Sequence, residues 1–216
     1  RGIDPESSDA PKTSKDALER FYGIPNGDIS ELSPSERTQL ANNIKLIRTG
    51  TKSNPNLIIL DKGTGQSART MPDTILSLAS DNKKRILFAQ GLYNQGGSAT
   101  LPYSGLTLIV SKQHSAAIKA DDPSANKYCF TIVRLEPPRG NDRIERYSYL
   151  AMTADELFSF SSEELMIDFG SKQTRKYDEN FSHGTFIKMF DYKIKPKRLR
   201  INNSIISKII IWKLTQ

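Results

Sequence analysis

An aspartate followed by two spaced glycines is the first feature of the sequence that could bind a ligand. Asp61-Lys62-Gly63-Thr64-Gly65 directly follows the apolar run 57–60, and a short apolar run bounded by turn residues is typical of a buried strand. A carboxylate at the end of such a strand can accept a hydrogen bond from an exocyclic amine. The glycines let the backbone turn sharply and approach a ligand closely. An ordinary turn between a strand and a helix has the same composition, so the segment by itself is a weak signal.

Two further segments have residue types that suit ligand binding. Residues 90–99 are rich in glycine and include Gly91, Asn94, Gly96 and Gly97; successive peptide N–H groups in such a run can form a nest for an anion, although a surface loop has the same composition. His183-Gly184-Thr185 opens the apolar stretch 186–190, which is typical of the start of a strand. The sequence contains no GxxxxGK[ST] pattern, which excludes a Walker-type phosphate loop.

In this order, the three segments resemble the GHKL superfamily of ATP-binding domains, which includes heat-shock chaperones, type II topoisomerase subunits, MutL, histidine kinases and MORC proteins. Asp61-x-Gly63-x-Gly65 looks like the first glycine box, Gly91-x-x-Asn94-x-Gly96 looks like the second, and Gly184-Thr185 looks like the later Gly-Thr strand. The resemblance covers roughly residues 40–192 and is nearest to bacterial and MORC-type members.

The resemblance implies a binding site for ATP. Asp61 would accept a hydrogen bond from the adenine amino group, Gly63 and Gly65 would leave room for the base, and Thr185 would support the contact directly or through a water. Residues 80–97 would form a lid over the triphosphate. Its phosphate contacts would come from the N–H groups of Gly91, Gly96 and Gly97 and from Asn82, Lys83 or Lys84.

The chain departs from the family pattern in two places. Asn94 stands where many members have a glycine. The N-terminal box, whose helix carries the Glu that activates water and the Asn that binds Mg²⁺, has no counterpart, since residues 1–12 contain Glu6 but no helical Glu-x-x-x-Asn pattern. We therefore assign no catalytic or metal-ligating residue. We expect the box to precede Arg1 in the natural protein and this chain to hydrolyse ATP poorly or not at all.

The positive charge is concentrated at the C-terminal end. The formal net charge is +7, and residues 186–216 hold eight Lys or Arg and one Asp, so the remainder of the chain is neutral. A nucleic-acid-binding protein with a uniformly basic surface would not show this distribution. The basic run could still bind phosphates, or it could be a solvated connector; the candidates are Lys195, Lys197, Arg198 and Arg200.

Composition excludes several other classes. Cys129 is the only cysteine and there are two histidines, so an internal disulfide, a Cys-rich zinc site and a histidine-rich metal centre are excluded. No apolar run approaches the length of a membrane span, and the expected location is the cytoplasm. Cys129 lies in an apolar stretch and is expected in the core, whereas His114 is expected in an exposed loop. The acidic pairs at 121–122, 155–156 and 163–164 are expected to be solvated.

Periodicity and capping patterns give the expected elements. Helices are predicted over 14–22, 34–43, 71–78, from 153 toward 160, and over 204–214; strands are predicted over 44–47, 57–60, 106–111, 128–135, 146–151 and 185–192. This order does not alternate strand and helix as a Rossmann fold does. It predicts an α/β (α+β) two-layer sandwich, with helices over one face of a mixed, mostly antiparallel sheet, which is also what the Bergerat fold of the GHKL family implies.

The leading hypothesis is therefore an ATP-binding domain over 1–192, followed by a basic connector and helix over 193–216. In the intact protein ATP would order the lid and signal to a partner domain or a second subunit, in a role around DNA or defence. Two alternatives stay open: a non-enzymatic nucleic-acid-binding domain that uses residues 193–200, and a protein-interaction domain with an empty pocket.

Overall fold

The computed structural model describes residues 7–77, 100–118, 120–138, 140–141, 143–167 and 179–193. The described residues fall into two compact units. Residues 7–42 form the unit that contains the helices, and the residues from 43 onward form the unit that contains the sheet. The predicted lid over 80–97 and the predicted helix over 204–214 lie outside the described residues.

Both helices of the first unit begin at capping boxes. Helix α1 (Ser14–Tyr22) starts after Thr13, whose hydroxyl accepts the N–H of Asp16 while the Asp16 carboxylate accepts the N–H of Thr13. Helix α2 (Pro34–Ala41) starts after Ser33, which makes the same reciprocal pair with Glu36. Such pairs satisfy N–H groups that a helix start leaves without an intrahelical acceptor, and both predicted helices are confirmed.

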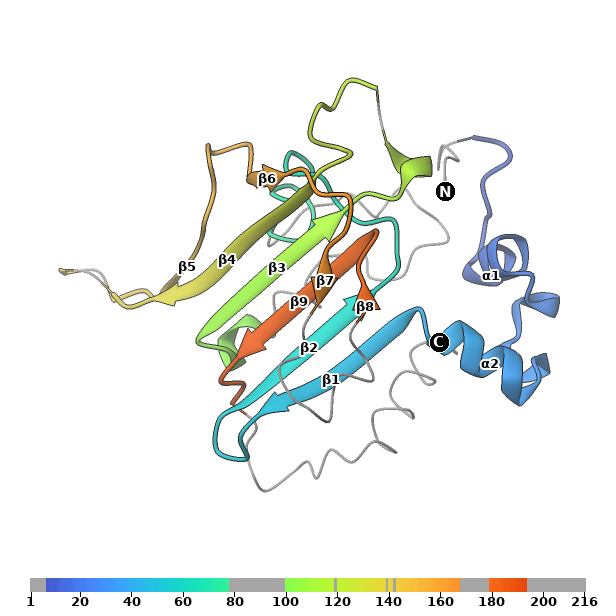
Figure 1. Cartoon of the computed structure of the whole chain (residues 1–216), viewed down its shortest axis with the longest axis horizontal. Coiled ribbons are helices and arrows are strands. Elements are labelled where there is room, and N and C mark those ends of the chain that lie inside the picture. Colours follow the sequence, from blue (N-terminus) through green and yellow to red (C-terminus); the bar gives the residue numbers. More distant parts are fainter. Residues whose placement is uncertain are drawn as a thin grey trace. The chain divides into compact units, whose positions relative to one another are not determined.

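The second unit is built on one twisted antiparallel sheet (Figure 1). Its strands follow the order β1-β2-β9-β3-β4-β5, and β6 also pairs with β4. β7 and β8 form a separate two-stranded ladder. The strands are β1 (Ile44–Gly50), β2 (Pro55–Asp61), β3 (Leu106–Lys112), β4 (Tyr128–Glu136), β5 (Arg146–Tyr149), β6 (Phe158–Phe160), β7 (Met166–Ile167), β8 (Glu179–Asn180) and β9 (Gly184–Phe190).

The fold belongs to the α+β class, and all six predicted strands are confirmed within a few residues. The expectation of a mixed sheet is wrong for the described strands, because each of their pairings is antiparallel. The C-terminal strand β9 inserts between β2 and β3. Local sequence patterns do not determine such an insertion, since it depends on pairing between distant segments.

Hydrophobic cores lie on both faces of the sheet, because successive side chains of a strand point to opposite faces. The first face, turned toward the viewer in Figure 1, carries Ile58, Leu60 and Phe186 and is covered by Ile167 and Phe181. The second face carries Ile109, Cys129 and Val133. It is covered by Ala68 and Met71 from the segment that follows β2, together with Leu157.

The predicted helix over 71–78 is wrong for its described part, where residues 68–75 form consecutive turns. The Thr74 hydroxyl lies 2.7 Å from the backbone oxygen of Thr70 and 2.9 Å from the side-chain oxygen of Gln66. The N–H of Leu76 reaches back to the oxygen of Met71. Side-chain hydrogen bonds compete with helical ones, and the turns let Met71 enter the core of the second face with no exposed surface.

The helix predicted from Thr153 toward Phe160 is also wrong. The N–H groups of Met152 and Thr153 both donate to the backbone oxygen of Glu156, which closes a tight turn. The chain then enters β6, where the ring of Phe158 stacks on that of Phe130 at 5.9 Å. Aromatic pairs across strands stabilise a sheet, and here this packing outweighs the local capping pattern.

The importance of the turn segment for the core can be tested with a matched pair of methionines. We expect Met71→Ala to lower the free energy of unfolding by about 2–5 kcal/mol, because it leaves a cavity where the side chain is fully buried. Met152, which is 65% exposed, provides the control, and Met152→Ala is expected to change that free energy by less than about 0.5 kcal/mol. Urea unfolding followed by circular dichroism measures both, and equal effects would show that the segment does not cover the sheet.

Candidate functional site

A row of polar side chains crosses one end of the sheet. In the register of the strands Asp61 lies opposite Thr185, Thr185 lies opposite Ser111, and Ser111 lies opposite Cys129. These four residues come from β2, β9, β3 and β4. Because directly opposite residues of antiparallel strands share a face, their side chains lie together on the second face. The next row inward on this face contains Ile59, Ile187 and Ile109, so the polar row borders an apolar surface.

The glycines of the two motifs allow the backbones to meet at this end of the sheet. Gly65 has φ +66°, and a Cβ there would lie 1.9 Å from the backbone oxygen of Lys112. Gly184 has φ +107°, and a Cβ there would lie 2.0 Å from the backbone oxygen of Asp61. Neither position has room for a side chain, and both have a backbone conformation that favours glycine.

Hydrogen bonds hold the turn after β2 at four points. The Asp61 carboxylate accepts the N–H of Gly63 at 2.8 Å. The N–H of Lys62 donates to the oxygen of Asn43 at 2.9 Å, and the N–H of His114 donates to the oxygen of Thr64 at 2.8 Å. The N–H of Gln66 donates to the hydroxyl of Ser111, also at 2.8 Å. The segment therefore presents Asp61 from a backbone that is already ordered.

Ser111 connects three parts of this site. It is fully buried, its hydroxyl lies 2.7 Å from the backbone oxygen of Gly184 and 3.3 Å from the hydroxyl of Thr185, and it accepts the N–H of Gln66. A hydroxyl inside an otherwise apolar strand, at a position that alternation turns inward, was the available signal for this residue. Sequence analysis did not single it out.

The carboxylate of Asp61 is half-buried, and its pKa differs from that of an ordinary aspartate. Burial raises its pKa above the ordinary value, because the charged form loses hydration; hydrogen bonds from the N–H groups of Gly63 and Thr185 act in the opposite direction and compensate only in part. A carboxylate in this state gains from a further hydrogen-bond donor, and a bound ligand can supply one.

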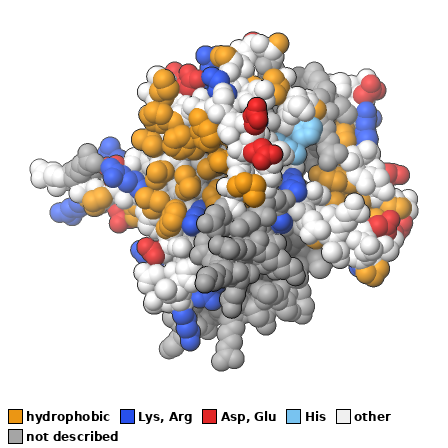
Figure 2. Space-filling model, viewed as in Figure 1, with side chains coloured by type: hydrophobic (Ala, Val, Ile, Leu, Met, Phe, Trp, Pro, Cys, Tyr) orange, Lys and Arg blue, Asp and Glu red, His pale blue; other side chains and the backbone are white. Residues whose placement is uncertain are grey.

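The two histidines of the chain lie beside the turn. Their rings meet edge to face with centroids 4.6 Å apart, and Figure 2 shows both together at the surface. His114 is therefore not simply an exposed loop residue: its Nδ1 accepts the N–H of Ala116, and its ring is half-buried. Burial lowers the pKa of His183, and His114 and Lys62 lower it further, so the His183 imidazole is neutral at about pH 7.

Cys129 closes the row as a core residue, as predicted. Its thiol lies 3.4 Å from the backbone oxygen of Gln66, and burial raises its pKa to about 12. Asp122 differs from the expectation of a solvated acid, since it accepts hydrogen bonds from the hydroxyls of Ser67 and Ser124. These contacts connect the turn segment to the loop before β4.

The structure brings together four of the predicted ligand-binding residues: Asp61, Gly63, Gly65 and Thr185. The other predicted positions lie outside the described residues. They are the lid and phosphate candidates Asn82, Lys83, Lys84, Gly91, Asn94, Gly96 and Gly97, and the basic residues Lys195, Lys197, Arg198 and Arg200. Within the described residues, no group of three or more His, Cys, Asp or Glu could hold a metal ion. No helix among them is long and apolar enough to cross a membrane.

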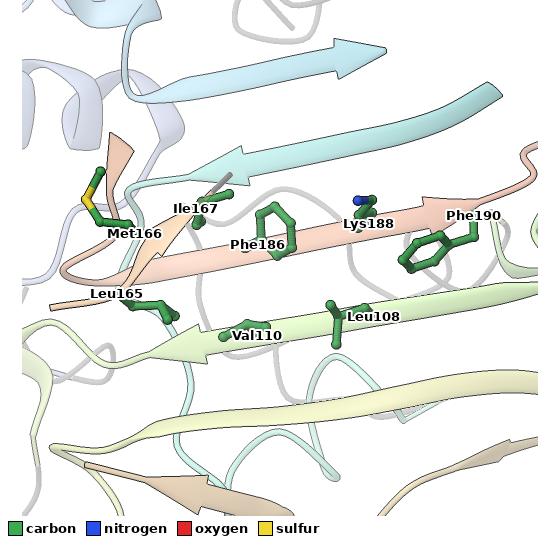
Figure 3. A pocket seen from close by; sticks show the side chains of 8 residues that line it. All are labelled: Leu108, Val110, Leu165, Met166, Ile167, Phe186, Lys188 and Phe190. Atoms are coloured by element: carbon green, nitrogen blue, oxygen red, sulfur yellow. The ribbon is translucent and has the colours of Figure 1, made fainter. Parts of the chain in front are cut away.

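A depression lies on the first face of the sheet, which is the face opposite to that of the polar row (Figure 3). Among the described residues that line it, Lys188 is the only charged one, and its Nζ lies 5.0 Å from the centre of the Phe190 ring. The other lining residues are apolar and come from β3, β9 and the β7 strand with the residue before it: Leu108, Val110, Leu165, Met166, Ile167, Phe186 and Phe190. None of the described residues that were predicted to bind a ligand, Asp61, Gly63, Gly65 and Thr185, lines this groove.

The raised pKa of Asp61 predicts how stability depends on pH. Because the native state favours the neutral carboxyl, Asp61 contributes stability below its unfolded-state pKa and loses that contribution as the pH rises through its raised native pKa. We therefore expect Asp61→Asn, which keeps an oxygen acceptor for Gly63, to have a higher Tm than the wild type at about pH 7. The gain should disappear toward about pH 3. Thermal unfolding across this range measures it, with the exposed Asp155→Asn as a control without such a gain; a gain that grows on acidification would contradict the prediction.

The buried thiol gives a second check of the site. We expect Cys129 to react with a thiol reagent at about pH 8 at least ~100-fold more slowly in the native protein than in urea, because the thiolate is the reactive form and burial suppresses it. Absorbance at the reagent's product wavelength gives both rates, and Cys129→Ser shows the background. Equal rates would mean that this end of the sheet is open to solvent.

Comparison with known proteins gave no match to a protein-family model and no significant match to a curated protein sequence.

Proposed function

We propose that this chain is an adenine-nucleotide-binding module of the GHKL type, with the base recognised at Asp61 and Thr185. One observation carries the proposal: Asp61 at the end of β2 and Thr185 at the start of β9, which are far apart in the sequence, lie directly opposite each other. These are the two side chains for which the motif resemblance implies contact with adenine.

The chemistry of the site supports an amine-bearing ligand. The Asp61 carboxylate is half-buried, it accepts hydrogen bonds from the N–H groups of Gly63 and Thr185, and burial nevertheless raises its pKa. An exocyclic amino group would donate a hydrogen bond to it and compensate for part of its lost hydration. The isoleucines of the adjacent row, Ile59, Ile187 and Ile109, suit the apolar face of a purine ring.

The glycines also support recognition of the base at Asp61. Gly65 and Gly184 let the turn and the start of β9 pack against neighbouring backbone, and the four hydrogen bonds of the turn hold Asp61 in place before any ligand arrives. Preorganisation of this kind reduces the entropy lost on binding.

The resemblance to the GHKL family also implies roles for residues outside the described part of the chain. The triphosphate and its Mg²⁺ would be bound by residues of the second glycine box and of an N-terminal helix, and nucleotide-driven closure of the lid over 80–97 would signal to a partner domain or a second subunit. A role around DNA or in defence follows from the same likeness and from the basic residues near the C-terminus. The described residues contribute recognition of the base.

Calorimetric titration of the whole chain with Mg-ATP tests the proposal. We expect Asp61→Asn to weaken ATP binding by at least about tenfold, because the amide replaces a charged acceptor with a weaker, neutral one. Asp155→Asn, an exposed control, should bind as the wild type does. Equal affinities of the wild type and Asp61→Asn would place the ligand elsewhere, and an absence of binding by all three proteins would contradict the proposal for this chain.

A further inference from the structure

The hydroxyl group of Ser111 belongs to none of the motifs. The role inferred for it here rests on the proposed function. Ser111 lies on β3 opposite Thr185 and has no exposed surface. Three polar atoms surround its Oγ: the backbone nitrogen of Gln66 at 2.8 Å, the backbone oxygen of Gly184 at 2.7 Å, and the hydroxyl oxygen of Thr185 at 3.3 Å.

The single proton of the Ser111 hydroxyl decides the direction of these bonds. A serine hydroxyl donates one hydrogen bond and accepts up to two. The oxygen of Gly184 can only accept, so Ser111 donates to it, and the N–H of Gln66 can only donate, so Ser111 accepts from it. The remaining bond to Thr185 then has one direction, in which the Thr185 hydroxyl donates to Ser111. The shorter distance to Gly184 favours this arrangement over one in which Ser111 donates to Thr185.

This arrangement leaves Thr185 as an acceptor toward a ligand. Its proton is used in the bond to Ser111, and no described residue donates to its oxygen, which can therefore accept a hydrogen bond from a ligand. Asp61, directly opposite on β2, is an acceptor as well when it is ionised. Two neighbouring acceptors match an amino group, which has two N–H donors, and they repel a carbonyl oxygen.

We propose that Ser111 is a positioning residue that holds the Thr185 hydroxyl as an acceptor, and that this makes the site selective for a purine with an amino group at position 6. A purine with hydrogen or a carbonyl oxygen at that position would offer no donor to either of the two acceptors. Leaving buried polar groups unpaired is costly, and it is an effective way to reject a close analogue.

The test compares ATP with purine riboside triphosphate, which lacks only the amino group, by calorimetric titration of the whole chain. The wild type is expected to prefer ATP by at least about tenfold. In Ser111→Ala the Thr185 hydroxyl loses its acceptor and is free to rotate and donate, so the preference should fall several-fold toward equality. The ratio of the two affinities is the readout, because a general disturbance of the site weakens both ligands together.

Variants of Thr185 provide the controls. They also test the inference if Ser111→Ala does not fold, because that change removes a hydrogen-bond partner of the Gln66 N–H and of the Gly184 oxygen. Thr185→Val keeps the shape of the side chain and removes the hydroxyl, so the preference for ATP should fall. Thr185→Ser keeps the hydroxyl and should retain the preference. The double variant Ser111→Ala/Thr185→Val should match Thr185→Val alone, because Ser111 acts through Thr185.

Each result has a definite meaning. A preference for ATP that is unchanged in Ser111→Ala or in Thr185→Val would overturn the inference, as would a double variant whose loss is the product of the two single losses. If the inference about Ser111 is overturned in this way but ATP binding still depends on Asp61, the proposed function is retained. Failure of the wild type to bind either nucleotide, or equal binding by Asp61→Asn, would overturn the proposed function and this inference with it.

Discussion

The hydrogen bonds of the Ser111 hydroxyl join the three segments from which the site is made. The turn after β2 reaches Ser111 through the N–H of Gln66, and the start of β9 reaches it through the oxygen of Gly184 and the hydroxyl of Thr185. All of this takes place where Ser111 is completely buried. A buried donor or acceptor that loses its partner costs about 1–3 kcal/mol, so this contact holds the turn after β2 and the start of β9 against β3.

Because Asp61 is partly buried, the free energy of its charged carboxylate depends on whether a ligand donates a hydrogen bond to it. The sheet holds a carboxylate where it has lost part of its hydration, and the resulting rise in its pKa measures the cost of its charge in the native state. A donor from a ligand lowers that cost and so favours binding at Asp61. Functional sites often have such strained electrostatics. The thiol of Cys129, at the other end of the polar row, has a pKa of about 12, stays neutral and adds no charge.

The two failed helix predictions have a common cause. Residues 71–78 and 153–160 both carry local signals for a helix, a suitable cap and spaced apolar residues. In each case a contact with the sheet outweighs those signals: Met71 enters the core of the second face, and Phe158 stacks on Phe130 across β4 and β6. The helices α1 and α2 formed as predicted, since their capping boxes are satisfied within a few residues. Propensity decides where no competing tertiary contact exists.

Short-range patterns of apolar residues, glycines and caps were sufficient to predict six of the described strands and the two N-terminal helices. They also placed Asp61 and Thr185 at the ends of strands, with Gly63 and Gly65 in the turn after the first of these strands. The position of β9 between β2 and β3 is visible only in the folded sheet. This placement sets Thr185 beside both Asp61 and Ser111. Pairing between strands distant in the chain depends on the combined packing of both faces of the sheet, and no local pattern contains that information.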